Sequence, residues 1–200
     1  EEVGELLDLV DSDTDSTESS KRMISFREHT RKRDLAILTL FLGTGIRISE
    51  LVGLNISSID FKSKAFKVTR KGGAQTILYM TDEIITALRD YLDEREEQKL
   101  IDGYPALFLS LQKRRITVRA VENLVKKYAS IVTPLKNITP HKLRSTFGTS
   151  LYNETNDIYV VAEILGHRDI NTTKRHYAAI SEQIKKEAAE KVHLRKDKKD

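Results

Sequence analysis

The chain has 200 residues, of which 39% are hydrophobic, so its length suits one well-buried domain. It contains no cysteine, which excludes disulfides and thiolate metal sites, and no apolar run reaches the roughly 18 residues that would cross a membrane. We therefore expect a cytoplasmic protein with no membrane partner.

The formal net charge of +4 is unevenly distributed. Residues 1–20 contain eight acidic residues and no Lys or Arg, so the rest of the chain has 34 basic and 22 acidic residues, a net charge of +12. A positive field of this size attracts polyanions by neutralising phosphates and releasing counterions. The charge alone indicates nucleic-acid binding only weakly.

The first ten residues predict a short amphipathic helix, because apolar residues recur at helical spacing: Val3, Leu6, Leu7 and Val10. We expect a flexible loop over 11–33, since the segment 11–20 is acidic and has almost nothing to bury.

The stretch LAILTLFL is apolar all round and predicts a central helix, with Asp34 as its N-cap and the glycines of GTG as its end. A second short helix, ISELVGL, follows Arg47 directly.

Between residues 59 and 80 the hydrophobic pattern changes to a period of two, interrupted by KGGAQ. This predicts a small antiparallel sheet in which the glycine pair forms a turn. LFLS at 107–110 is a possible further strand, and the remaining periodic segments predict helices at 82–100, 117–130, 140–153, 157–165 and 181–192. The predicted fold class is mainly α with a small antiparallel β-sheet (α+β).

The segment TPHKLR predicts an anion-binding helix start. Thr139 is a suitable N-cap, Pro140 fits the first helical position, and His141 and Arg144 then share one face of the first turn. A surface histidine beside a solvated arginine is the alternative that this spacing alone leaves open.

The segment LGHRDINTTKRHY concentrates basic and hydroxyl residues between His167 and Tyr177. Asp157 can cap the preceding helix and Gly166 can end it, which leaves His167 just beyond a helix end. Taken alone, such a histidine is more often a C-terminal cap, and such a tyrosine is more often a packing residue.

Five motifs occur together in one order: TGIRISEL, KGG, HKLR, LGH and the tyrosine ten residues later. In this order and combination they resemble the catalytic domain of the tyrosine recombinases, the phage integrase and Xer-like family, over about residues 2–192. The resemblance implies the tyrosine-recombinase catalytic-domain fold.

The resemblance also implies a role for each motif residue. Arg47 and Arg144 hold the scissile phosphate, Lys71 lies on the hairpin of the sheet, and His141 and His167 complete the phosphate pocket. Tyr177 is the nucleophile that forms a covalent 3'-phosphotyrosyl intermediate, and Glu50 supports the pocket. Of these, His141 is a suitable base for the tyrosine and Lys71 a suitable acid for the leaving hydroxyl.

Further basic and hydroxyl residues are candidates for contacts to the DNA backbone. They are Arg114, Arg115, Arg119, Lys142, Arg168, Thr172, Thr173, Lys174 and Arg175. The sequence shows neither clustered metal ligands nor a nucleotide-binding glycine motif, so we expect no metal and no cofactor.

From the resemblance we expect a catalytic domain over 1–180, without the helical core-binding domain that precedes it in the family. We expect residues 181–200 to form a tail helix that docks onto a neighbouring protomer. The implied partners are double-stranded DNA and three further copies of the chain in a tetramer, and accessory directionality proteins are a further class.

Two other functions remain open at this point. One is a non-catalytic DNA-binding relative that has kept the fold, and the other is a tyrosine-type topoisomerase. Whether a recombinase of this kind would integrate a mobile element, excise one or resolve chromosome dimers is not encoded in these motifs.

Overall fold

The computed structural model describes residues 2–11, 30–97, 104–134, 136, 138–167, 171 and 173. These residues belong to two compact units, Glu1–Gly148 and Thr149–Asp200. In the described ranges no helix is long and apolar enough to cross a membrane. Most of the predicted acidic loop and the whole predicted tail helix lie outside the described residues.

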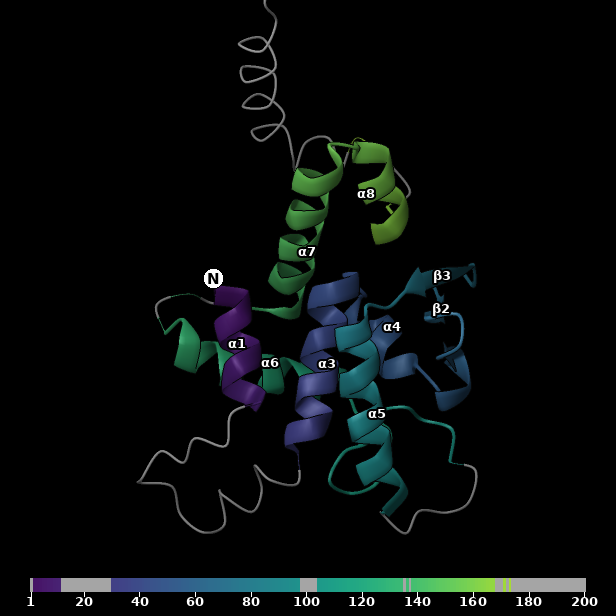
Figure 1. The fold of residues 1–200 in the computed structure, drawn as a ribbon, viewed down its shortest axis with the longest axis vertical. Coiled ribbons are helices and arrows are strands. Elements are labelled where there is room, and N and C mark those ends of the chain that lie inside the picture. Colours follow the sequence, from purple (N-terminus) through teal and green to yellow (C-terminus); the bar gives the residue numbers. More distant parts are fainter. Residues whose placement is uncertain are drawn as a thin grey trace, which may run out of the picture. The chain divides into compact units, whose positions relative to one another are not determined.

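The larger unit is built around α3 (Arg31–Thr44), which is buried along most of its length, as its all-round apolar pattern predicts. The helices α1 (Glu2–Asp11) and α5 (Asp82–Glu97) pack against it (Figure 1). α6 (Val118–Val132) packs against both α1 and the short α4 (Ile48–Gly53).

The predicted N-cap of the central helix is wrong. α3 begins at Arg31, three residues before Asp34, and Thr30 precedes it without a side-chain capping bond. Asp34 is instead buried inside the helix, where its carboxylate accepts hydrogen bonds from Arg33 and from the Tyr128 hydroxyl at 3.1 Å. Burial raises the pKa of this carboxyl, against the opposing effect of Arg33.

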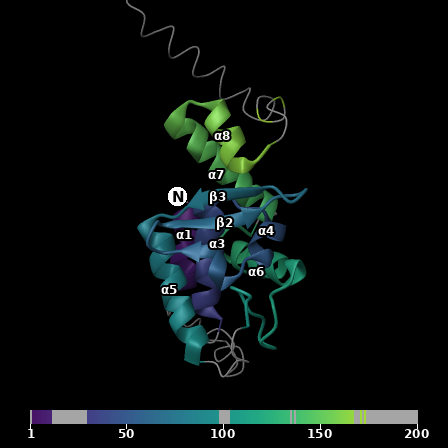
Figure 2. The ribbon, with the colours of Figure 1, turned by 90° about the vertical axis from the view of Figure 1, so that its right-hand side faces the viewer.

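The predicted antiparallel sheet is confirmed, with strands β1 (Ile59–Asp60), β2 (Ala65–Thr69) and β3 (Gln75–Tyr79) in that spatial order (Figure 2). Phe66, Val68 and Leu78 face the core, whereas Ile77 and Tyr79 on the edge strand are exposed. The sheet therefore has one buried face, which fixes its register.

LFLS does not form a strand. Leu109 makes only an isolated bridge to Arg115, although residues 107–109 are buried. The segment is held by scattered backbone bonds, such as that from the Leu107 amide to the Leu54 carbonyl, and by side chains: the Leu109 amide donates to the Tyr91 hydroxyl, and the Leu109 carbonyl accepts from Arg33. Burial alone, without a neighbouring strand, explains the apolar run.

α7 (Pro140–Thr155) begins in the larger unit and continues into the smaller one, which also contains α8 (Ile158–Leu165). Both predicted ends of α8 are confirmed, because Asp157 accepts two backbone N–H groups and Gly166 has a left-handed φ of 60°. With a helical majority and one small antiparallel sheet, the predicted fold class is confirmed.

Candidate active site

Arg47 lies directly before α4, where its position is fixed by Glu50 in the first turn of that helix. The carboxylate of Glu50 accepts the Arg47 backbone N–H at 3.1 Å and the Arg47 Nη1 at 2.9 Å. Glu50 is buried with a side-chain exposure of 3%, whereas Arg47 remains 34% exposed. The acid therefore holds both the backbone and the side chain of an arginine that solvent and ligands can still reach.

Lys71 lies at the tip of the hairpin between β2 and β3, and its side chain is exposed. The turn is closed by a hydrogen bond from the Gly73 amide to the Arg70 carbonyl at 3.0 Å. Gly72 has φ 93°, the positive value that the third position of a type II turn requires. The glycines of KGG thus form the turn on which the lysine is carried.

Arg70 is a buried cation that the sequence reasoning missed. Its Nη1 lies 3.1 Å and 3.0 Å from the two carboxylate oxygens of Glu50. Glu50 therefore contacts two arginines, one directly before α4 and one from the hairpin. A signal was present in the sequence, because Arg70 continues the alternation of the inward-facing Phe66 and Val68.

His141 and Arg144 both lie in the first turns of α7, as predicted. The Thr139 hydroxyl accepts the Lys142 amide at 3.3 Å, which supports the predicted N-cap. His141 and Lys142 are exposed, whereas Arg144 is buried and donates from Nη1 to the Gly45 carbonyl. Gly45 is the left-handed residue that ends α3, two positions before Arg47.

In the smaller unit, His167 follows the left-handed Gly166 and is half-buried. Its amide donates to the Ala162 carbonyl at 2.9 Å, and its Nδ1 lies 2.7 Å from the Thr173 hydroxyl. Thr173 is completely buried. The hydroxyl orients the imidazole. The sequence predicts a DNA contact for Thr173, whereas in the structure this side chain is buried against His167.

The three arginines near the start of α6 have different surroundings. Arg115 donates to the carbonyls of Val52 and Leu54 and to the Asn55 side chain, at 2.9, 2.8 and 2.6 Å. Arg114 is exposed, and Arg119, which is 81% exposed, lies 3.6 Å from Glu122. The guanidinium of Arg115 thus holds the fold, and the other two guanidiniums face solvent.

The remaining predicted site residues, Tyr177 among them, lie outside the described residues. The others are Arg168, Thr172, Lys174 and Arg175. Their roles stay predictions.

The larger unit brings together the segments of both predicted phosphate-holding arginines. Arg144 contacts the Gly45 carbonyl, and Arg47, Glu50 and Arg70 form a connected ion cluster. Two guanidiniums around one carboxylate leave an excess of one positive charge, and the next residue after Arg70 is the exposed Lys71. Such an arrangement can bind an oxyanion and stabilise charge that develops on it.

The phage integrase family matches residues 16–183 of the chain. Tyrosine recombinase XerC of Thermodesulfovibrio yellowstonii is 40% identical over 149 residues, which cover 72% of this chain and 50% of that protein. The chain spans about half the length of the curated relatives it matches.

Solved structures agree with this assignment. The crystal structure of XerA recombinase superimposes with a TM-score of 0.74 at 28% identity, over 93% of this chain and 62% of that one. The Tn1549 transposon integrase in complex with circular intermediate DNA gives a TM-score of 0.63 at 27% identity, over 87% of this chain and 58% of that one. From its sequence and its fold alike, the chain belongs to the phage integrase family of tyrosine recombinases.

Proposed function

We propose that this chain is the catalytic domain of a site-specific recombinase that cleaves and rejoins DNA strands through a covalent 3'-phosphotyrosyl intermediate. The observation that supports this most strongly is the ion cluster of Arg47, Glu50 and Arg70, together with the contact of Arg144 to the Gly45 carbonyl. We propose that these contacts hold Arg47 and Arg144, which are distant in the sequence, so that both can bind one oxyanion.

The proposed ligand of the two arginines is the scissile phosphate of DNA. Attack on a phosphodiester adds negative charge to the non-bridging oxygens, and donors already held in place stabilise that charge without reorganising. Guanidinium groups suit this role because they remain charged and can donate two parallel hydrogen bonds to phosphate.

In the proposed step the Tyr177 oxygen attacks phosphorus and the bond from phosphorus to the 5' oxygen breaks. The tyrosine proton passes to His141, and the departing 5' oxygen takes a proton from the Lys71 ammonium. His167 and the two arginines bind the non-bridging oxygens. Attack by a 5' hydroxyl from another strand reverses the sequence and restores a phosphodiester, so we propose that neither ATP nor a metal ion is needed.

We propose that double-stranded DNA is the substrate and that four copies of the chain act together on it. The Tn1549 integrase, which shares the fold, was solved with DNA, and this supports the proposed partner. The exposed Arg114, Arg119 and Lys142 are proposed backbone contacts. The tail at 181–200 is proposed to dock onto a neighbouring protomer, so its deletion should weaken assembly on DNA and leave folding intact.

A pool of nicked duplexes with a randomised central sequence tests the chemistry. Cleavage beside the nick releases a short fragment, which prevents religation and traps the intermediate. We expect a protein–DNA adduct that survives denaturant, carries the DNA on residue 177 and is lost in Tyr177→Phe. The sequence recovered from the adduct then provides a defined substrate.

Two outcomes would contradict the proposal. Absence of any adduct across the pool would favour a non-catalytic DNA-binding protein. An adduct that never joins strands from two different duplexes, while relaxing supercoiled DNA, would favour a topoisomerase.

A further inference from the structure

Arg70 stands at a position where the strand pattern calls for an apolar side chain. Phe66 and Val68 on β2 face the core, and Arg70 continues the same parity. Only 9% of its side chain is exposed. Burying a guanidinium is costly unless hydrogen bonds and an opposite charge compensate it, so the contacts of Arg70 explain why it is there.

The compensating charge is the carboxylate that also holds Arg47. Arg70 Nη1 reaches Glu50 Oε1 at 3.1 Å and Oε2 at 3.0 Å, and Arg47 Nη1 reaches Oε1 at 2.9 Å. One negative charge is thereby shared between two positive charges. Without Arg70, the carboxylate would have Arg47 as its only ion-pair partner in this cluster, which would leave that arginine less able to attract a phosphate.

The backbone of Arg70 also defines the turn that carries Lys71. Its amide donates to the Ala74 carbonyl at 2.7 Å, and its carbonyl accepts the Gly73 amide at 3.0 Å. Lys71 is the next residue, and the rest of the turn is exposed. Within the described part of the hairpin tip, the Arg70 side chain is the buried group that ties this turn to Glu50.

We propose that Arg70 is a positioning residue which, through Glu50, holds the Lys71 turn and Arg47 in one fixed arrangement. This inference rests on the proposed function, in which Lys71 protonates the leaving 5' oxygen. Arg70 itself does not contact the DNA in this account. Loss of Arg70 displaces Lys71. It also leaves Glu50 paired with Arg47 alone in this cluster, which weakens the attraction of Arg47 for phosphate.

The test compares two substrates that differ only in the leaving atom. One is the nicked duplex that traps the intermediate, with an ordinary 5' oxygen at the scissile phosphate. The other is the same duplex with a bridging 5' sulfur at that phosphate. A thiol has a pKa of ~8.5, so a thiolate leaves without taking a proton. We expect Arg70→Met to slow cleavage of the ordinary substrate by about 10²-fold, because misplacing the acid by about 1 Å costs that much.

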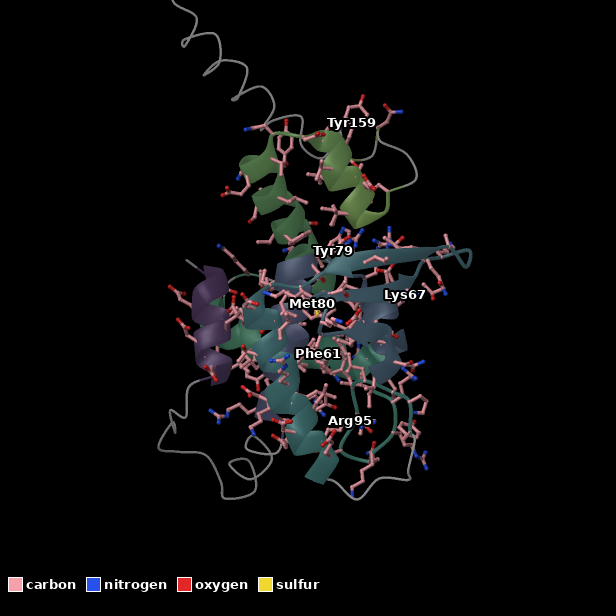
Figure 3. The ribbon with its side chains drawn as sticks, turned by 45° about the vertical axis from the view of Figure 1, so that its right-hand side comes forward. Phe61, Lys67, Tyr79, Met80, Arg95 and Tyr159 are labelled. Atoms are coloured by element: carbon pink, nitrogen blue, oxygen red, sulfur yellow. The ribbon has the colours of Figure 1, made fainter. Side chains whose placement is uncertain are left out.

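The sulfur substrate should be slowed at least about tenfold less, since it no longer needs the acid. Arg70→Lys, which keeps the charge but loses the planar fork, should lie between wild type and Arg70→Met on both substrates. Lys67→Met removes a cation from the exposed face of the same hairpin (Figure 3) and should leave the ratio of the two rates unchanged.

Two results and one folding control separate the possible failures. If the wild-type chain forms no adduct with either substrate, the proposed function fails and takes this inference with it. If Arg70→Met is folded and slows both substrates equally or neither, Arg70 does not position the acid, and the inference alone is overturned. Thermal unfolding of each variant, together with Arg70→Lys as the milder change, identifies any loss that comes from misfolding, because misfolding lowers both rates by the same factor.

Discussion

Arg144 donates a hydrogen bond to the carbonyl of Gly45, a residue that precedes it by 99 positions. The bond ties the start of α7 to the turn between α3 and α4, and Gly45 adopts φ 59° there to end α3. One guanidinium therefore joins two segments that are distant in sequence and completes the fold next to Arg47.

Replacing Arg144 by lysine keeps the charge but removes the fork, so one ammonium cannot both hold the Gly45 carbonyl and make the proposed contact to phosphate. We expect Arg144→Lys to slow single-turnover adduct formation by about 10²- to 10³-fold. Thr146→Ala, on the exposed face of the same helix, is the matched control and should cleave at the wild-type rate. Equal rates for Arg144→Lys and wild type would remove Arg144 from the phosphate site.

The hydroxyl of Thr173 orients His167, and the two groups lie 2.7 Å apart. Thr173→Val keeps the shape but removes the hydrogen bond, a loss of about 1 kcal/mol, so cleavage should slow several-fold, up to about tenfold. Thr173→Ser keeps the hydroxyl and should retain most of the rate. A valine variant that cleaves at the wild-type rate across the pH profile would show that this hydrogen bond does not support catalysis.

Arg114 and Arg115 are neighbours whose substitutions should affect different properties: Arg115 the stability of the fold, and Arg114 the binding of DNA. Arg115→Met would remove the hydrogen bonds that this guanidinium donates to two backbone carbonyls and to the Asn55 side chain, so we expect a loss of about 1–3 kcal/mol in the free energy of unfolding. Arg114→Met should change stability by less than about 0.5 kcal/mol. It should instead weaken DNA binding and reduce the magnitude of the salt slope by about one, as loss of one phosphate contact requires.

Urea unfolding and salt-dependent DNA binding measure these two effects separately. A destabilised Arg114→Met together with a fully stable Arg115→Met would contradict the assignment of the two guanidiniums.

Burial raises the pKa of Asp34 above its ordinary value of 3.8. The folded state then binds this proton more tightly than the unfolded state, so the stabilising contribution is full below pH 3.8 and is lost as pH rises through the folded pKa. Asp34→Asn cannot titrate. The free energy of unfolding of the wild type, measured relative to Asp34→Asn by urea titration, should therefore fall as pH is raised. A difference that grows with pH would show that Arg33 and Tyr128 outweigh burial.

Local chemistry made much of this fold predictable. Both ends of α8 follow from Asp157 and Gly166, and the sheet follows from its period-two pattern around KGG. The resemblance to the family came from five motifs in order, and it placed Arg47 and Arg144 in segments that the structure joins.

Contacts between distant segments were not predictable in the same way. The burial of Asp34 depends on Tyr128, 94 residues later, and the pairing of Arg70 with Glu50 spans 20 residues. Without these partners, a carboxylate before an apolar run indicates a cap, and a basic residue beside a turn indicates a surface. Thr173 shows the same limit, since only the folded unit reveals that its hydroxyl meets an imidazole.

The contacts that connect Gly45 with Arg144 and Glu50 with Arg70 have a consequence for when the protein becomes active. They join three stretches that emerge from the ribosome at separate times, and no single stretch contains all of these contacts. A nascent chain that ends before α7 lacks one of the two guanidiniums and the carbonyl contact that seats it. If the proposed function holds, an unfinished chain would not cleave DNA, because these contacts form only after long-range folding is complete.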